Sequence, residues 1–275
     1  MDADTLSLGF VPAERVILHE GVEPRRVSEL MQLLRSDGVL RNPPVVAPIG
    51  QRWVVLDGAT RVTALQRIGT PHLLVQTVDP QHPGLEVRTW HHLVTGVRPD
   101  ELRDQLAHIP GVRLQEHAAQ LEAQMHLDEK RLLCYLVLQH TPVLALEGGE
   151  DLHSQVLLLH QVVDAYRART RIHRVVTTEL ETLLKQHENV TAVVVFPRYG
   201  LDEILALAGD EVKLPTGITR FVIPGRVLRM DIPLDTLTSA QPLEEKNRWL
   251  ERFIMDKLAQ KKIRYYQEPV FLFDD

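Results

Sequence analysis

Hydrophobic residues recur with two different periods in the first third of the chain. Apolar positions three and four residues apart predict helices over 27–36 and 61–68, each followed by a glycine that can end it. Short apolar runs that contain β-branched residues predict strands over 15–19, 45–47, 53–56 and 72–78. Strands that alternate with helices in this way predict an α/β unit.

The rest of the chain continues with mixed patterns. Residues from about 85 to 165 are predicted to be mostly helical or mixed, with a helix over 116–130, a hairpin of 132–138 and 142–145 around Gln139-His140-Thr141, and a strong amphipathic helix over 151–169. A second α/β pattern predicts helices over 177–187, 202–208 and 243–262. It also predicts strands over 191–196, 219–223, 227–232 and 264–273.

These patterns predict an α/β (α+β) chain with two domains. We expect a mixed-sheet domain over residues 1–84, packed with a second region, residues 85–275, that combines a helical connection with a C-terminal α/β domain. The length of 275 residues and the apolar fraction of 44% suit a globular protein with ample core. The net charge of −6 excludes a surface that is basic throughout, although a local basic patch stays possible.

Cysteine usage and terminal composition bear on the compartment. The single cysteine, Cys134, lies in an apolar run and is predicted to be a buried core thiol, which fits a reducing compartment. The first twelve residues lack the basic start and apolar core of a signal peptide, and no apolar run is long enough to span a bilayer. We expect a cytoplasmic protein without a membrane partner.

The most informative stretch runs from Val54 to Leu65, where a strand ends at Asp57-Gly58 and a helix begins at once. Asp57 is a candidate acidic ligand, and Gly58 permits a sharp turn or close approach to a ligand. Thr60 offers a hydroxyl and an N–H at a helix start, where unpaired N–H groups favour an anion. Arg61 adds a planar guanidinium that matches phosphate. An ordinary strand-to-helix connection with an exposed arginine explains the same pattern.

Three other segments carry candidate chemistry. Gly217 to Arg226 holds two glycines, two arginines and a threonine in ten residues, which suits an anionic ligand or, equally, a turn, a strand and a turn with surface arginines. Glu20 follows a strand, where a loop carboxylate can act as a base or simply be solvated. His91 and His92 lack the neighbouring cysteines or carboxylates of a zinc site, and adjacent histidines in a helix point about 100° apart. We therefore predict no structural zinc.

The order and spacing of six segments resemble the ParB/sulfiredoxin-like superfamily and, within it, the free-serine kinases. The segments are His19-Glu20, Asn42 to Val46, Leu56 to Arg61, Val75 to Asp79, Thr89 to His92, and Gly217 to Arg226. The resemblance spans nearly the whole chain. It implies a ParB/sulfiredoxin-like nucleotide-binding fold for residues 1–84, with the C-terminal region completing the substrate site.

The resemblance also implies a role for each matched position. Glu20 is similar to the family's catalytic glutamate, which takes the proton from the serine hydroxyl, and Asp57 to the acidic residue at the phosphoryl-transfer centre, close to Mg²⁺. The nucleotide- and phosphate-binding residues implied are Gly58, Ala59, Thr60 and Arg61. The substrate-binding residues implied are Trp90, Thr219, Phe221 and Arg226. Phe221 stands where family members often carry a histidine, and this change removes a polar partner from the substrate pocket.

The resemblance implies a small-molecule kinase that transfers a phosphoryl group from ADP or ATP, with Mg²⁺, to free L-serine and yields O-phospho-L-serine. Its expected partners are therefore a nucleotide and a small amino acid, and no oligomeric state is predicted. The alternatives are a ParB-like nucleotide-binding, DNA-binding transcriptional regulator without kinase activity, a ParB-type nuclease, and an inactive module that senses a ligand. The acidic net charge and the lack of a clear helix-turn-helix argue against DNA binding.

Overall fold

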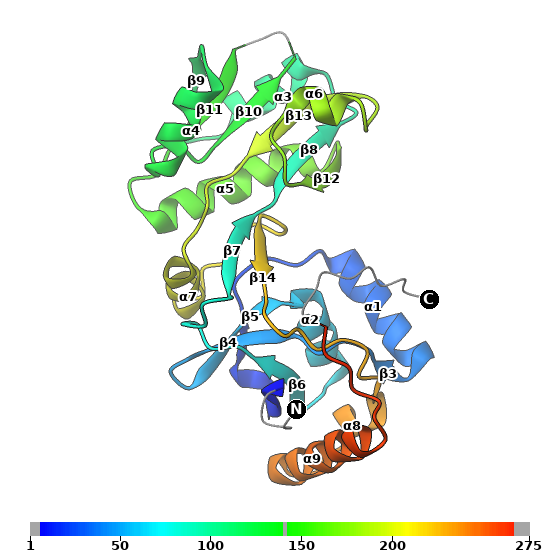
Figure 1. The fold of residues 1–275 in the computed structure, drawn as a ribbon. Coiled ribbons are helices and arrows are strands. Elements are labelled where there is room, and N and C mark those ends of the chain that lie inside the picture. Colours follow the sequence, from blue (N-terminus) through cyan, green and yellow to red (C-terminus); the bar gives the residue numbers. More distant parts are fainter. Residues whose placement is uncertain (1–5, 140–141, 267–275) are drawn as a thin grey trace. The chain divides into compact units, whose positions relative to one another are not determined.

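Two β-sheets, one in each of two units, organise the chain (Figure 1). The computed structural model describes residues 6–139 and 142–266. Unit 1 comprises the described residues up to Ile17, Val22–Leu85 and the described residues from Ile223 onward, and unit 2 comprises Leu18–Gly21 and Glu86–Val222. The mixed α/β class predicted from the sequence is confirmed.

Unit 1 is built on a five-stranded mixed sheet. Its strands, in spatial order, are β1 (Leu8–Pro12), β6 (His72–Thr77), β4 (Val45–Ile49), β5 (Arg52–Asp57) and β2 (Val16–Leu18). Strand β4 pairs parallel with β6, whereas β1 with β6 and β4 with β5 are antiparallel. The central strands are fully buried in their middle, which explains why they appear in the sequence as continuous apolar runs.

Helices and a small second ladder complete unit 1. They are η2 (Ala13–Arg15), α1 (Pro24–Asp37), α2 (Ala59–Ile68), α8 (Leu234–Thr238), α9 (Leu243–Ala259), and the pair β3 (Val39–Leu40) with β15 (Ile232–Pro233). Gly38 and Gly69 end α1 and α2 in the left-handed conformation, as the sequence predicts. On α9, the Asn247 amide accepts from the Phe10 N–H at 2.8 Å and donates to its carbonyl at 3.2 Å, so it satisfies the edge strand β1.

The observed units divide the chain differently from the two expected sequence ranges. The described residues from Ile223 onward pack with the N-terminal sheet rather than with the residues that precede them. The contacts responsible join residues far apart in sequence, such as Ile232 with Leu40 in a ladder and Asn247 with Phe10. Local hydrophobic patterns depend on residues close together in sequence, so they do not show which distant segments pair. Which unit is the ParB-like nucleotide-binding domain stays a prediction.

Unit 2 is built on a six-stranded sheet whose neighbouring strands pair antiparallel. In spatial order they are β12 (Arg171–Val175), β8 (His91–Thr95), β13 (Val190–Val195), β10 (Cys134–Leu138), β11 (Val143–Glu147) and β9 (Arg113–His117). A separate two-stranded ladder joins β7 (Glu86–Thr89) and β14 (Thr219–Val222). This ladder brings the segment before Trp90 beside the segment that holds Thr219.

Each face of the six-stranded sheet packs against its own helices. One face contacts α3 (Pro99–Ala107), α5 (Leu152–Arg167) and α7 (Leu201–Gly209), and the other contacts α4 (Gln120–Asp128) and α6 (Leu180–Leu184). Strand pleating divides neighbouring residues between the two cores, so that Val94 joins the first core and Leu93 the second. Cys134 is fully buried in the first core, which confirms its predicted placement.

Several predicted elements are wrong. Residues 116–130 do not form one helix, because β9 pairs with β11 up to His117 and α4 begins only at Gln120. The helix expected over 177–187 is the single short α6. Residues 227–231 form no strand, and β15 begins at Ile232. His91 and His92 lie in strand β8, not in a helix, and therefore face opposite sides of the sheet.

Strands β1, β7, β8, β9 and β12 went unpredicted. Strands β9 and β12 lie at the two edges of the unit 2 sheet and are strongly polar, so their alternating signal is weak. Two predictions fall outside the described residues: the turn at His140-Thr141, and most of the strand expected over 264–273. Within residues 6–139 and 142–266, no helix combines the length and apolar character needed to cross a membrane.

Candidate functional site

The first candidate cluster, in unit 1, is the turn from Asp57 to Arg61. Asp57 is the last residue of β5, Gly58 has a φ of +95°, and α2 begins at Ala59. A glycine fits here because only it adopts this backbone angle without strain, and a Cβ at Gly58 would lie 3.0 Å from the Arg61 guanidinium. The turn places the Asp57 carboxylate beside the first turn of the helix, as the sequence predicts.

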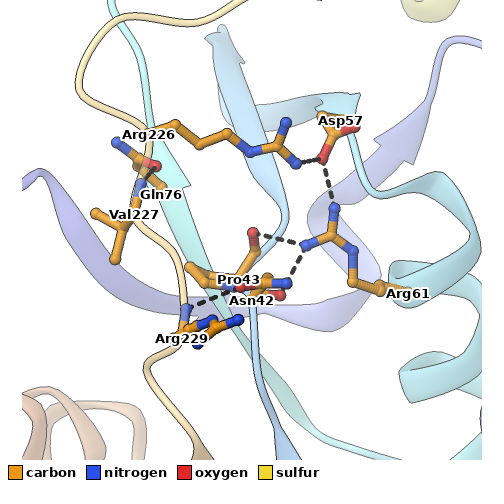
Figure 2. Close-up of polar contacts among 8 residues, drawn as sticks. All are labelled: Asn42, Pro43, Asp57, Arg61, Gln76, Arg226, Val227 and Arg229. Atoms are coloured by element: carbon orange, nitrogen blue, oxygen red, sulfur yellow. Dashed lines mark hydrogen bonds and ion pairs between the residues drawn. The ribbon is translucent and has the colours of Figure 1, made fainter. Parts of the chain in front are cut away.

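Arg61 holds this turn together from inside unit 1 (Figure 2). One guanidinium nitrogen donates to the carbonyls of Asn42 and Pro43, at 2.8 and 3.1 Å, and the other donates to the Asp57 carboxylate. Burial lowers the pKa of Arg61, and the charge of Asp57 acts in the opposite direction. Since arginine stays protonated in proteins, Arg61 is a partly buried cation whose charge Asp57 helps to balance.

Arg226 contacts the same carboxylate oxygen of Asp57 from the segment that follows β14 (Figure 2). The Arg226 side chain is more exposed than that of Arg61, 36% against 19%. The Gln76 side chain fixes the Arg226 segment, because it donates to the Gly225 carbonyl and accepts from the Val227 N–H, both at 2.9 Å. A buried glutamine on β6 thus positions a cation 150 residues further along the chain.

The arrangement in unit 1 can hold an anion. Helix α2 has no side-chain cap at its N-terminus, so the N–H groups of Ala59 and Thr60 are available to an oxyanion. Arg226 adds a partly exposed positive charge at the same turn. The two arginines share one Asp57 oxygen, and within the described residues the second oxygen accepts no hydrogen bond. A carboxylate oxygen is the kind of ligand that Mg²⁺ takes, since this ion is commonly held by one or two carboxylates together with substrate phosphates.

The second candidate cluster, in unit 2, surrounds Glu20. One Glu20 oxygen accepts from the Gly217 N–H at 3.0 Å and from the Thr219 hydroxyl at 3.4 Å. The His19 Nε2 lies 2.8 Å from the same hydroxyl. A hydroxyl has one proton, so its donation to Glu20 makes His19 the donor to the Thr219 oxygen. We call His19, Glu20, Gly217 and Thr219 the acceptor cluster.

Backbone contacts hold the acceptor cluster in place. The Leu214 N–H donates to the His19 carbonyl at 2.8 Å, and the Leu214 carbonyl accepts from the Gly21 N–H at 2.9 Å. These two bonds form a parallel β-bridge between Leu214 and Glu20. Gly217 has a φ of +80°, and a Cβ there would lie 2.4 Å from the Arg174 side chain. The sequence signal for this glycine is the dense Gly217–Arg226 segment, although its bond to Glu20 could not be inferred from spacing.

Phe221 and Trp90 lie near the acceptor cluster along its own strands. The Phe221 ring meets the buried His19 ring edge-on, with centroids 5.4 Å apart. Phe221 therefore contacts this cluster through an aromatic contact and not a hydrogen bond. The backbone N–H of Trp90 donates to the Ile218 carbonyl at 2.9 Å. The centre of the Trp90 ring lies 4.8 Å from the Arg220 guanidinium.

The structure thus gathers the predicted residues into two groups, each within one unit. Unit 1 holds Asp57, Gly58, Ala59, Thr60, Arg61 and Arg226, and unit 2 holds Glu20, Trp90, Thr219 and Phe221. Sequence reasoning missed the roles of Asn42 and Gln76 as supports for the turn. Both lie inside segments already singled out by resemblance, and that was the available signal.

Comparisons with known proteins add to this geometry. No family model matches the chain. SbnI, an ATP-dependent L-serine kinase of Staphylococcus aureus, is 27% identical over 267 residues, which cover 96% of each sequence. The chain is similar to free L-serine kinases. An ATP-dependent L-serine kinase of Staphylothermus marinus is 27% identical over 89 residues, 32% of this chain and 35% of that relative.

Solved structures of free L-serine kinases share the fold. SbnI with a C-terminal truncation matches with a TM-score of 0.74 and 22% identity, over 94% of this chain and 100% of that one. A free serine kinase in complex with AMP matches with a TM-score of 0.73 and 17% identity, over 84% of this chain and 94% of that one. At these identities the likeness establishes the common fold, which agrees with the predicted α/β class.

Proposed function

We propose that this protein is a free L-serine kinase that transfers a phosphoryl group from a nucleotide to the serine hydroxyl and forms O-phospho-L-serine. The observation that carries the proposal is the acceptor cluster: a partly buried glutamate, held by a backbone N–H and a threonine hydroxyl, in a chain that matches an L-serine kinase over 96% of its length. We favour ATP as the donor because both relatives are named ATP-dependent.

In this proposal Glu20 is the general base. Its second carboxylate oxygen has no hydrogen-bond partner among the described residues, so it is free to accept the proton of the serine hydroxyl. The bonds from Gly217 and Thr219 fix the direction of that oxygen. As the proton leaves, the serine oxygen attacks the γ-phosphorus, the bond from phosphorus to the bridging oxygen breaks, and ADP leaves with that electron pair.

The turn from Asp57 to Arg61 binds the nucleotide phosphates. The free N–H groups of Ala59 and Thr60 and the guanidinium of Arg226 supply donors to phosphate oxygens, while Arg61 supports the turn from inside. Asp57 is the residue that would hold Mg²⁺, and the ion would offset the negative charge of the phosphates. Phosphoryl transfer depends mainly on positioning and charge stabilisation, which are the properties these residues offer.

Trp90 and Phe221 line the amino-acid site in this proposal. Their apolar rings exclude water near the acceptor hydroxyl, and Phe221 replaces a polar contact with an aromatic contact to His19. An acceptor pocket with fewer polar groups discriminates less against close relatives of serine. Threonine and homoserine are therefore useful competing acceptors.

Phosphorus NMR of the purified protein with Mg²⁺, L-serine, and ATP or ADP in parallel tubes tests the proposal. A new phosphomonoester signal at the position of O-phosphoserine supports it and identifies the donor. Glu20→Gln should lower turnover by about a hundredfold or more while nucleotide affinity stays the same. Glu86→Gln is the matched control, because Glu86 pairs with Arg88 on an exposed surface of the same unit. Equal turnover in both variants would remove Glu20 from the mechanism.

Nucleotide affinity tests the turn separately. Arg226→Gln should weaken ATP binding about tenfold, since one charge-assisted contact to phosphate is lost. Arg88 is a surface arginine, and Arg88→Gln, which removes the same charge, should leave the affinity for ATP unchanged. Tight nucleotide binding without product would identify a ligand sensor instead of an enzyme. Salt-dependent binding to duplex DNA without product would favour the regulator.

A further inference from the structure

Unit 2 contains a surface cavity that neither candidate cluster uses. Its volume is about 730 Å³, within the range of about 300–1,000 Å³ that small-molecule sites occupy. It lies where β12, at the edge of the six-stranded sheet, meets the end of β8 and the segment that follows α6 (Figure 1). We call it the edge cavity. Basic and amide side chains line much of it, from Arg169, Arg171, His173, Gln186, His187 and Asn189.

The edge cavity is separate from the acceptor cluster of the same unit. Strand β8 begins at His91, directly after Trp90, whose backbone bonds to Ile218 beside Thr219. The strand ends at Thr95, which lines the edge cavity. Four residues along a strand span about 13 Å, at about 3.3 Å per residue. A molecule in the edge cavity is therefore not the amino acid placed beside the general base.

The edge cavity presents positive charge that no carboxylate neutralises. Arg169 and Arg171 are both exposed, and within residues 6–139 and 142–266 neither forms an ion pair. Glu188 is the one carboxylate among the described residues that line the cavity. Like charges near one cavity repel, so an anion bound between the two arginines is stabilised. A guanidinium also matches phosphate geometrically, because it can donate two parallel hydrogen bonds.

Two histidines add hydrogen-bond donors at the same place. His173 follows Arg171 by two residues on β12, so the two side chains leave the strand on one face. The centroids of the His173 and His187 rings are 5.0 Å apart, and the rings are tilted by 45°. In the described part of the chain, no hydrogen bond occupies their ring nitrogens. Each neutral imidazole can donate one N–H, and a phosphate group has enough oxygens to accept from both rings and both arginines.

Backbone contacts fix the floor of the edge cavity. Thr95 is paired with Arg171 across the sheet, and its hydroxyl donates to the Arg171 carbonyl at 3.3 Å. The Gly96 N–H donates to the Asn189 carbonyl at 3.1 Å, which joins the end of β8 to the segment after α6. The charged side chains therefore extend from an ordered backbone, and a preformed site loses less entropy when it binds a ligand.

We propose that the edge cavity is a second ligand site, which binds a small phosphorylated molecule that also carries an ammonium group. The arginines and histidines bind the phosphate, and Glu188 pairs with the ammonium group. O-Phospho-L-serine has both groups. The inference rests on the proposed function only for the choice of this compound, the proposed product, as a probe.

The amide NMR signals of two glycines test the proposal in the full chain. Gly96 lines the edge cavity, and Gly217 belongs to the acceptor cluster. Inorganic phosphate should shift the Gly96 signal in a saturable way and leave the Gly217 signal in place. O-Phospho-L-serine should saturate the Gly96 shift at a concentration a few-fold lower, because of the added ion pair with Glu188. L-Serine, which lacks phosphate, should not shift Gly96.

Three substitutions locate the binding. Arg171→Gln should raise the Kd for both phosphate compounds about tenfold, because a charge-assisted contact is lost. Glu188→Gln should remove the advantage of O-phospho-L-serine over inorganic phosphate. Arg103→Gln is the matched control, because Arg103 is an exposed arginine of the same unit that pairs with Glu116, and this variant should bind as the wild type does.

An unmoved Gly96 signal with both phosphate compounds, or an unchanged Kd in Arg171→Gln, would overturn the inference. If Arg171→Gln does not fold, the Kd of Arg169→Gln decides in its place. Equal affinities of the wild type for the two phosphate compounds would refute the pairing of Glu188 with an ammonium group. A protein that binds phosphate at Gly96 but makes no O-phosphoserine would refute the proposed function and support this inference, since the NMR titration needs no turnover.

Discussion

Acidification should weaken unit 2 through His92, and the size of the effect follows from its burial. The pKa of His92 is lowered from 6.5 to about 3, mainly because burial disfavours the charged ring. Because the pKa of His92 is lowered in the folded protein, the imidazole binds a proton more readily in the unfolded chain. Above about pH 6.5 the imidazole is neutral in both the folded and the unfolded chain, so it does not change the free energy of unfolding. That free energy then falls progressively as the pH falls from about 6.5 toward 3.

The loss can be worked out for a single pH. Each pH unit inside this window costs about 1.4 kcal/mol for one titrating group, so at pH 5 His92 alone should reduce the free energy of unfolding by about 2 kcal/mol relative to neutral pH. This is a large share of the typical total stability of a domain, which is about 5–15 kcal/mol. Burial also lowers the pKa of His91, to about 4, so His91 adds to the loss in the same direction.

Urea unfolding between pH 5 and 8 measures this loss. The chain has three tryptophans, and with Trp53 and Trp249 replaced by phenylalanine, Trp90 reports on unit 2 alone. His92→Gln in this background should flatten the dependence of the unfolding free energy on pH by about 2 kcal/mol at pH 5. His173→Gln, which removes an exposed histidine of the same sheet, should not. Parallel curves for wild type and His92→Gln would show that His92 is not buried in its neutral form.

Three further outcomes follow from the contacts described above. Gly217→Ala should destabilise unit 2 by about 1–2 kcal/mol in urea unfolding, because its φ of +80° is strained for alanine and the Arg174 side chain must move. Gln76→Leu should leave two backbone groups near Arg226 without partners, and limited proteolysis should then cut that segment faster than in the wild type. Burial raises the pKa of the Cys134 thiol, so a thiol reagent should label it only after denaturant unfolds the protein, and fast labelling of native protein would contradict its placement.

Local chemistry allowed much of the fold to be predicted. Helices α1, α2, α5 and α9 have apolar residues at helical spacing and recognisable ends, and these signals depend only on residues a few positions apart. The strand, glycine turn and helix start around Asp57 have the same property, and the structure places them as expected. Elements whose stability comes from partners, such as β9, β12 and β15, were missed or misplaced.

The candidate site shows the same division. Glu20 and Asp57 stay predicted site residues, singled out because a carboxylate at the end of a strand is visible in a short stretch of sequence, and Thr219 stays one that the resemblance implies. The sequence could not show that Arg61 faces inward to backbone carbonyls, or that Gln76 holds the segment of Arg226.

By itself, then, the sequence determined the mixed α/β class, the elements with strong local signals such as α1, α2 and α5, and which residue types are available for phosphate and proton chemistry. Only the tertiary structure decided that Glu20 is held by Gly217 and Thr219, about 200 residues away, and that the described residues after Ile223 join the N-terminal sheet. The physical reason is that backbone conformation responds to neighbours along the chain, whereas hydrogen-bond partners and burial depend on which distant segments pack together.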